Sequence, residues 1–323
     1  MMRAIRVCRF GGPEVLQLHT DVPVPVPKGN QVVVQVKAAG VNPVDTYIRS
    51  GTYARKPTLP YTPGGDGSGV IHSVGENVTR LQKGDHVWFG MSLSGSYAEY
   101  CLCEEARVGK LPDDASFEQG AMLAVPYCTA YRALVQKAGV RAGETIMVHG
   151  ATGGVGTAAV QICKLLGANV VATAGSAFGE RLLKDLGVQK VFNHRSETYV
   201  DAIKSETSGQ IDIILEMLAN VNLEKDLEMI GQNGRIVVIG SRGSIMVNPR
   251  LTMGKESSVI GCSLFSSTAG ESLAQMKFIE ANILNGLNPV LAKMFQLEDA
   301  GEAHREIIEN SGTKGQIVLR TAI

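Results

Sequence analysis

Glycines gather in the middle of the chain, where residues 149–157 read His-Gly-Ala-Thr-Gly-Gly-Val-Gly-Thr. A glycine backbone lets a pyrophosphate approach closely. The free N–H groups and the positive dipole end of a helix that follows then attract that anion. The spacing is G-x-x-G-x-x-G in place of the usual G-x-G-x-x-G. These residue types favour binding of a dinucleotide phosphate, although a tight strand-to-helix turn also uses glycine.

The elements around this turn are those that a dinucleotide site needs. Thr145–Val148 is an apolar run that predicts a buried strand, and residues 158–166 have apolar residues at helical spacing. A second apolar run, residues 169–174, follows. Strand, glycine turn, helix and strand within about thirty residues predict a nucleotide-binding unit.

The end of the second strand indicates which dinucleotide binds. An NAD site usually places Asp or Glu there to bond the ribose 2′-OH, but this chain continues Ala174-Gly175-Ser176 without an acid. His194 and Arg195 follow the next predicted strand and can meet a 2′-phosphate. Unit charges about 4 Å apart interact by roughly 4 kcal/mol at an effective dielectric of about 20. We therefore expect NADPH as the cofactor.

The composition is that of an ordinary globular chain of 323 residues, 44% of them hydrophobic and 19% charged. The formal net charge is zero, so we expect no bulk attraction to nucleic acid or to anionic membranes. No long apolar run and no signal-peptide pattern is present, which predicts a cytoplasmic location. The six cysteines are scattered and expected to be reduced. Cys101 and Cys103 fall on one face of a strand and are expected to pack.

The order of predicted elements divides the chain into two domains. Residues 1–124 hold short strands between turns, such as residues 31–40, 67–75 and 86–89, and this pattern predicts a β-rich barrel. From residue 125 strands and helices alternate, which predicts a doubly wound parallel sheet. Its six strands are expected at residues 145–148, 170–173, 190–193, 211–215, 235–239 and 257–261.

The last part of the chain is expected to return to the first domain. A helix is predicted over residues 271–287, and residues 315–320 form a strand for which a finished six-stranded sheet has no place. The predicted α/β fold is a barrel domain of residues 1–124 and 266–323 with an inserted dinucleotide-binding domain of residues 125–265. We expect the chemistry in a cleft between the two.

This organisation and several local motifs resemble the zinc-independent NADPH:quinone oxidoreductases of the medium-chain dehydrogenase/reductase superfamily, most closely the zeta-crystallin group. The motifs that carry the resemblance are Phe10–Leu16, Gly40–Tyr53, Leu59–Gly64, Val148–Gly156, Asn193–Arg195, Glu216–Leu223, Gly240–Gly243, Lys255–Ser258 and Leu264–Ser267. The resemblance runs from end to end of the chain. It implies a GroES-like barrel domain with an inserted Rossmann domain.

The same resemblance argues against a catalytic zinc. Zinc-dependent alcohol dehydrogenases of the superfamily have a cysteine at the position of Asn42, and G-H-E where this chain has Gly64-Gly65-Asp66. They also carry a four-cysteine lobe that has no counterpart here. A catalytic zinc needs three protein ligands from Cys, His or carboxylate. We therefore expect no metal.

The resemblance also implies which residues contact the cofactor. The predicted NADPH-binding residues are Tyr47, Thr152, Gly153, Gly154, Val155, Gly175, His194, Arg195, Asn222, Ile239, Gly240, Ser241, Arg242, Cys262, Ser263 and Leu264. Within this set, residues 152–155 cover the pyrophosphate, and Gly175 and His194 lie near the adenosine ribose and its phosphate. Residues 262–264 line the nicotinamide end.

Three neutral hydrogen-bonding residues, Asn42, Tyr47 and Tyr53, are the predicted catalytic residues. A quinone needs an electron donor held close and groups that bond its developing oxyanion. Asn42 can equally form the turn before Pro43, and the tyrosines can be an apolar wall. Asp45 is expected to cap a helix rather than to catalyse.

The predicted function is the NADPH-dependent reduction of quinones without a metal. A reductase of α,β-unsaturated carbonyls fits the same fold and cofactor. A third interpretation, binding of AU-rich RNA or a structural role in the lens, comes from the resemblance alone, since the chain has no RRM or KH signature. The resemblance further implies a homo-oligomer, either a dimer or a tetramer.

Overall fold

The computed structural model describes residues 1–309 and 314–321. The chain divides into two compact units, one made of residues 1–125 and 272–323 and the other of residues 126–271. The sequence pattern puts these two boundaries after residues 124 and 265. Helices α3 (Ala124–Tyr131) and α9 (Ala269–Asn282) span the boundaries.

Most strands belong to the first unit, which has a GroES-like fold. Its strands are β1 (Met2–Arg6), β2 (Gln17–Val22), β3 (Gln31–Val41), β4 (Asp66–Val74), β5 (His86–Gly90), β6 (Tyr100–Glu104), β7 (Val108–Lys110), β14 (Leu291–Gln296) and β15 (Gln316–Arg320). Its helices are α1 (Pro43–Ser50), α2 (Phe117–Ala121) and α10 (Ala300–Glu309).

The long strand β3 organises the sheet of the first unit. Six strands pair in the order β14-β15-β3-β4-β5-β7, and β6, the seventh strand of the sheet, pairs with β3. The late strand β15 lies in this sheet of the first unit, as the sequence predicts, and it pairs antiparallel with β3, with Ile317 opposite Val41. Valines of β3 pack with Phe89 and Tyr97 in the core, where both aromatic side chains are fully buried. Cys101 and Cys103 are buried in this core, as expected.

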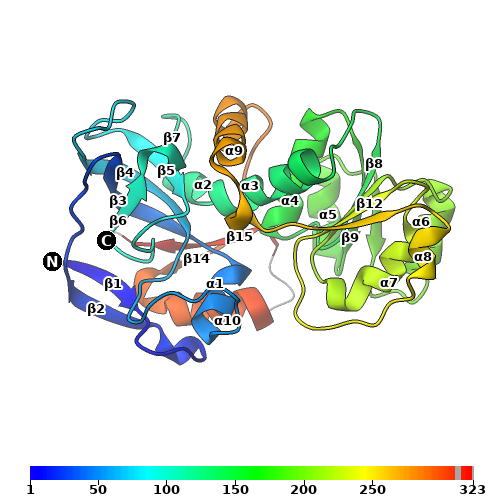
Figure 1. The fold of residues 1–323 in the computed structure, drawn as a ribbon, viewed down its shortest axis with the longest axis horizontal. Coiled ribbons are helices and arrows are strands. Elements are labelled where there is room, and N and C mark those ends of the chain that lie inside the picture. Colours follow the sequence, from blue (N-terminus) through cyan, green and yellow to red (C-terminus); the bar gives the residue numbers. More distant parts are fainter. Residues whose placement is uncertain (310–313, 322–323) are drawn as a thin grey trace. The chain divides into compact units, whose positions relative to one another are not determined.

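The second unit is a doubly wound α/β domain (Figure 1). Its strands are β8 (Thr145–Val148), β9 (Asn169–Ala174), β10 (Lys190–Asn193), β11 (Ile213–Glu216), β12 (Arg235–Val238) and β13 (Ser258–Gly261). Its helices are α4 (Gly154–Leu165), α5 (Ala177–Asp185), α6 (Tyr199–Thr207), α7 (Ala219–Met229) and α8 (Arg250–Met253).

All six strands of this unit run parallel, in the order β10-β9-β8-β11-β12-β13. Parallel strands are covered by helices and are therefore rich in apolar residues. Met147, Ile214 and Ile236, from neighbouring strands, are fully buried in one core cluster. The strand order reverses direction between β8 and β11, and ligands of such sheets bind at this point, beyond the carboxyl ends of the strands.

Two sequence expectations were wrong in detail. The helix predicted over residues 271–287 ends at Asn282, because the chain turns there with left-handed backbone at Leu284 (φ 63°) and Gly286 (φ 121°). Strand β14 was not predicted, since most of its residues are exposed and show no apolar alternation.

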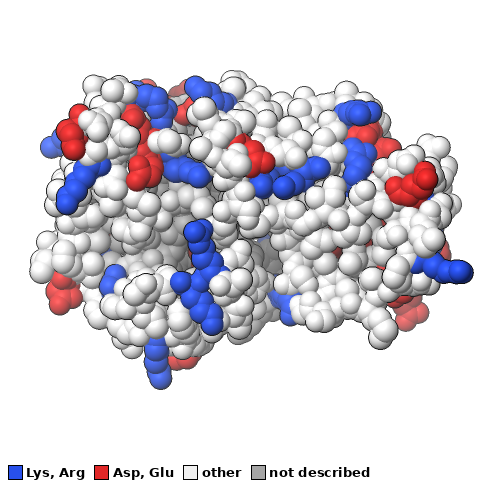
Figure 2. All heavy atoms as spheres, viewed as in Figure 1, with Lys and Arg blue, Asp and Glu red and all other residues white. Residues whose placement is uncertain are grey.

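Over residues 1–309 and 314–321, no helix combines the length and the apolar character that crossing a membrane requires. Basic and acidic side chains are interspersed over the face seen in Figure 2, in keeping with the formal net charge of zero.

Candidate functional site

The glycine turn connects β8 to α4 and leaves the start of this helix open. Gly153 is the N-cap residue, and no described side chain caps the helix. The first N–H groups of a helix have no acceptor within it, so they are available to an anion. Gly153, Gly154 and Val155 are half-buried, whereas Thr152 is buried.

Gly156 makes the turn possible by close packing. A Cβ atom at this position would lie 2.4 Å from the carbonyl oxygen of Gly150 and 2.5 Å from Cα of Ala151. A Cβ atom at Gly153 would meet only the Gly150 oxygen, at 3.5 Å. The turn therefore needs glycine at position 156 for close packing, while glycine at position 153 leaves the outer surface of the turn without a side chain.

The other predicted cofactor residues of this unit follow the ends of parallel strands. Because parallel strands end at one edge of a sheet, these residues share the carboxyl edge. They are Gly175 after β9, His194 and Arg195 after β10, Asn222 after β11, Ile239, Gly240, Ser241 and Arg242 after β12, and Cys262, Ser263 and Leu264 after β13.

Two basic residues lie against Gly175. A Cβ atom on Gly175 would meet the His194 ring at 2.9 Å and Nε of Arg195 at 3.3 Å. The His194 N–H donates to the Ala174 carbonyl at 3.2 Å, which holds the loop after β10 beside the end of β9. The nearest acid along the chain, Glu180, pairs with Lys184 at 2.7 Å. Basic residues, Arg195 and His194, therefore lie against Gly175 just after the end of β9.

The segments after β11 and β12 are held together by hydrogen bonds. The Arg242 N–H donates to Asn220 Oδ1 at 2.8 Å, and the Ala219 N–H donates to the Gly240 carbonyl at 2.9 Å. Cys262 follows β13 at the same edge. Burial raises the pKa of its thiol to about 11, so this thiol is neutral.

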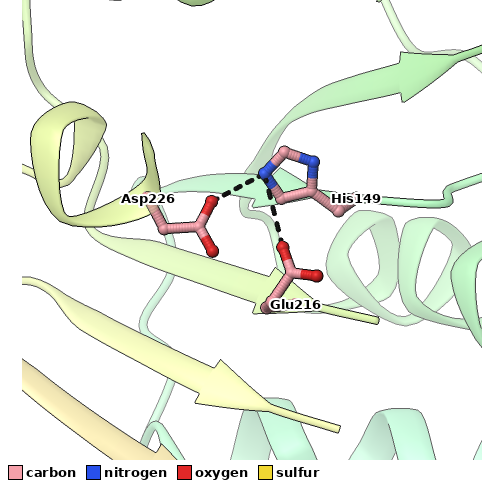
Figure 3. Close-up of side chains that lie close together, drawn as sticks. All are labelled: His149, Glu216 and Asp226. Atoms are coloured by element: carbon pink, nitrogen blue, oxygen red, sulfur yellow. Dashed lines mark hydrogen bonds and ion pairs between the residues drawn. The ribbon is translucent and has the colours of Figure 1, made fainter. Parts of the chain in front are cut away.

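A buried cluster of His149, Glu216 and Asp226 lies at the same edge, and the sequence gives no signal of it (Figure 3). His149 follows β8, Glu216 ends β11 and Asp226 belongs to α7. Nε2 of His149 is 2.8 Å from Asp226 Oδ1 and 3.7 Å from Glu216 Oε2. The chain positions are far apart, and only the parallel pairing of β8 with β11 brings the first two together.

In the first unit Asn42 is buried and fully engaged. Its Nδ2 donates to Asp66 Oδ1 at 2.8 Å, and its Oδ1 accepts from Nε2 of Gln316 at 2.9 Å. Asp66 also accepts from the Val125 N–H at 2.9 Å. Burial raises the pKa of Asp66 to about 7. The amide of Asn42 thus joins β3, β4 and β15.

Helix α1 carries Tyr47 and ends just before Tyr53. Asp45 accepts from the Asn42 N–H at 2.9 Å, so it caps the helix start as expected. Burial raises the pKa of Asp45 to about 7. At the other end, the Tyr53 N–H donates to the Tyr47 carbonyl at 3.2 Å. Both tyrosines are half-buried, and their backbones are fixed to one another.

Behind this helix a hydrogen-bond network ties α1 to α10. The Tyr97 hydroxyl lies 3.5 Å from Asp45 Oδ2 and 3.1 Å from Nε2 of His304, whose Nδ1 lies 3.3 Å from Arg49. Burial lowers the pKa of His304 to about 3, so this ring stays neutral. The network therefore orients α1 from its buried side.

Two family models match the chain, one in each unit. The alcohol dehydrogenase GroES-like domain matches residues 28–113, and the zinc-binding dehydrogenase domain matches residues 154–279. Among solved structures, the quinone oxidoreductase of Pseudomonas syringae pv. Tomato DC3000 is similar, with 31% identity and a TM-score of 0.90 over 99% of this chain and 100% of that one. A mycobacterial protein solved in complex with NADPH has 28% identity and the same TM-score, over 99% and 100%.

Curated relatives match more closely in sequence. The human quinone oxidoreductase is 52% identical over 99% of this chain and 98% of its own length, and the rat quinone oxidoreductase is 50% identical over the same shares. With half of its residues identical over nearly the whole of both chains, this chain belongs to the quinone oxidoreductase (zeta-crystallin) family of medium-chain dehydrogenases/reductases.

Proposed function

We propose that the protein reduces quinones with NADPH, bound along the carboxyl edge of the parallel sheet in the second unit. The observation that carries the proposal is the bare, glycine-lined start of α4 at the strand-order reversal. Relatives named quinone oxidoreductase at about half identity support the acceptor class. The bound dinucleotide would supply the reducing electrons, and the protein would supply orientation and polarity.

The choice of NADPH over NADH rests on the end of β9. His194 and Arg195 lie against Gly175, where a dehydrogenase that uses NAD would have a carboxylate. The Arg195 guanidinium and the hydrogen-bonding ring of His194 favour a 2′-phosphate, and both side chains are exposed, so solvent weakens the attraction. A preference of about tenfold, or about 1.4 kcal/mol, is the expected scale.

On the acceptor side we propose that Tyr47 and Tyr53 contact the quinone. Their phenol groups can donate hydrogen bonds to an oxygen that gains negative charge during reduction. Asn42 is proposed to act indirectly, because its side-chain amide is buried and bonded to Asp66 and Gln316. It fixes the start of the segment that carries the two tyrosines.

The residues do not fit a catalytic zinc, although a matching family model is described as zinc-binding. Zinc takes Cys, His and carboxylate ligands. Of the three positions that hold ligands in the zinc-dependent enzymes, Gly65 has no side chain, and Asn42 and Asp66 are hydrogen-bonded to each other at 2.8 Å. We therefore propose a reaction that needs no metal.

The test compares acceptors and cofactors in one assay. Oxidation of NADPH and of NADH is followed with an ortho-quinone and with an α,β-unsaturated ketone, before and after dialysis against a strong chelator. We expect turnover with the quinone and NADPH that survives the chelator. Turnover with the ketone alone would assign the protein to the enone reductases, and loss of activity with loss of one zinc per chain would contradict the metal-free reaction.

A cytoplasmic location, a homo-oligomer and binding of AU-rich RNA stay predictions. Interspersed charges on the face seen in Figure 2 give RNA binding no support.

A further inference from the structure

The buried cluster of His149, Glu216 and Asp226 is short of hydrogen-bond donors. The three residues are at most 3% exposed. Asp226 Oδ1 accepts from Nε2 of His149, and Glu216 Oε1 accepts from the Leu218 N–H and from Asn222 Nδ2 at 3.2 Å. Glu216 Oε2 and Asp226 Oδ2 have no hydrogen-bond partner among the described residues. Buried oxygens of this kind are normally paired.

One proton on Glu216 supplies the missing donor. Placed on Oε2, it can donate to Asp226, which satisfies both unpaired oxygens at once. Burial raises the pKa of Glu216 and that of Asp226 to about 7 each. A single proton held by the pair avoids two negative charges side by side in the interior. Burial also lowers the pKa of His149, so its imidazole is neutral and does not hold the additional proton.

One contact of this cluster has the geometry of a direct hydrogen bond. The distance of 2.8 Å between His149 Nε2 and Asp226 Oδ1 is that of a hydrogen bond. The remaining ring nitrogen of His149 lies 3.5 Å from the hydroxyl of Thr173.

The same carboxyl holds the backbone that follows β11. Oε1 of Glu216 accepts hydrogen bonds from the Leu218 N–H and from Asn222 Nδ2, and the main-chain carbonyl of Glu216 accepts one from the Ile239 N–H at 2.8 Å. Asn222 and Ile239 belong to two predicted cofactor segments. A shift of the Glu216 side chain is therefore transmitted to Leu218 and Asn222, whereas Ile239 is bonded to the main chain of Glu216.

We propose that Glu216 is a positioning residue for the cofactor, and that a proton on its Oε2, shared with Asp226, keeps it in place. This inference rests on the proposed binding of NADPH at the carboxyl edge. When the proton is lost, two adjacent carboxylates repel each other inside the domain, the segment after β11 moves, and NADPH binds more weakly.

Two other titratable groups face the cluster. Lys225 on α7 lowers the pKa of both Asp226 and His149 by its charge. Tyr199 on α6 has its pKa raised by burial and then by Asp226 and Glu216, and the Lys225 ammonium lies 5.4 Å from its ring centroid. Tyr199 therefore stays protonated in the range of the test, and Lys225 offsets the single negative charge on Asp226.

The decisive variant is Glu216→Gln, which replaces the protonated oxygen by an amide that also donates. Dissociation constants for NADPH are measured by fluorescence titration at pH 6 and pH 8.5. We expect E216Q to match the wild type at pH 6 and to bind about tenfold more tightly than the wild type at pH 8.5. Glu216→Ala removes the acceptor of Leu218 and should bind about tenfold more weakly at both pH values. Asp201→Asn, exposed on α6, is the matched control and should follow the wild type.

A second measurement needs no cofactor. A folded-state pKa of about 7 for Glu216, against 4.5 for the free group, means that the folded state holds a proton that the unfolded state releases. This contribution to stability is present below about pH 4.5 and is lost as pH rises through 7. The unfolding midpoint of the wild type should therefore fall more steeply between pH 5 and pH 8 than that of E216Q.

The outcomes separate this inference from the proposed function. Wild-type protein that binds no NADPH at any pH would contradict the proposed function. Wild-type protein that binds NADPH, with E216Q showing the same pH dependence of affinity and of unfolding, would overturn the inference alone. Zinc at one equivalent per chain that is lost in E216A would also overturn it, because the cluster would then hold a metal and not a proton.

Discussion

Two glycines in the turn after β8 should respond differently to the same added methyl group. Gly156→Ala places a carbon 2.4 Å from the Gly150 oxygen and 2.5 Å from Cα of Ala151, both of them backbone atoms that cannot rotate away. Overpacking of this kind costs up to about 3 kcal/mol, and alanine inside α4 regains about 1 kcal/mol of helix propensity. The net loss of stability is about 2 kcal/mol.

Gly153→Ala should leave stability nearly unchanged. The added carbon meets only the Gly150 oxygen at 3.5 Å, an ordinary contact, and the backbone at φ −82° suits any residue. A poorer N-cap costs less than about 1 kcal/mol. The methyl group stands on the open side of the turn, where the pyrophosphate is proposed to lie, so NADPH should bind at least about tenfold more weakly.

Thermal unfolding and NADPH titration of both variants test this contrast. For a unit of this size about 2 kcal/mol corresponds to a fall in the unfolding midpoint of roughly 4–8 °C. Gly254→Ala, where the added carbon would have no described atom within 4 Å, is the control and should match the wild type in both assays. If G156A is as stable as the wild type, or if G153A binds NADPH as tightly, the assignment of roles to the two glycines is refuted.

Three more outcomes are expected. Arg195→Ala and His194→Ala should each weaken NADPH binding several-fold in a fluorescence titration and leave NADH binding unchanged. The control Arg181→Ala, on the exposed face of α5, should change neither affinity. Equal losses of affinity for both dinucleotides would show that the 2′-phosphate does not contact this loop. Tyr53→Ala should raise the Michaelis constant for quinone about five- to a hundredfold with NADPH affinity constant, and unchanged quinone kinetics in a folded variant would show that Tyr53 is wall or surface. Burial raises the pKa of Asp66 from 3.8 to about 7, so its contribution to stability is present below about pH 4 and is lost as pH rises through 7. In Asp66→Asn the unfolding midpoint should therefore fall less steeply with pH over that range. A slope equal to that of the wild type would mean that Asp66 is ionised in the folded protein.

The second unit could be read from the sequence because its signals are local. An apolar run, a glycine turn and a helical pattern lie within one short stretch, and the structure has β8 and α4 where that stretch predicts them. The missing acid after Ala174 is a local signal too. Parallel strands, buried on both faces, leave uninterrupted apolar runs that are easy to recognise.

The parts that could not be predicted depend on distant pairing. Gln316 and Asn42 are 274 positions apart, and Asp226 and His149 are 77 apart. Nothing in the sequence around Asn42 shows that its amide will be bonded to β15, so the sequence alone leaves open whether Asn42 acts on the acceptor or forms the turn before Pro43. A histidine without metal spacing in sequence likewise gave no sign of the two carboxylates that the fold brings to it.

The pairing of β15 with β3 sets the order in which the chain can finish folding. The second unit is one continuous stretch, residues 126–271, and the paired residues of its strands lie at most 67 positions apart, as Ile213 does from Ile146. It can complete its core while the ribosome is still adding residues. The first unit must wait for residues 316–320, because Ile317 pairs with Val41 and Gln316 bonds to Asn42. A newly made chain therefore passes through a stage in which the second unit is finished while Asn42, at the start of the helix bearing Tyr47, still lacks Gln316. A chaperone that recognises this protein should meet it with the β15-facing edge of β3 exposed.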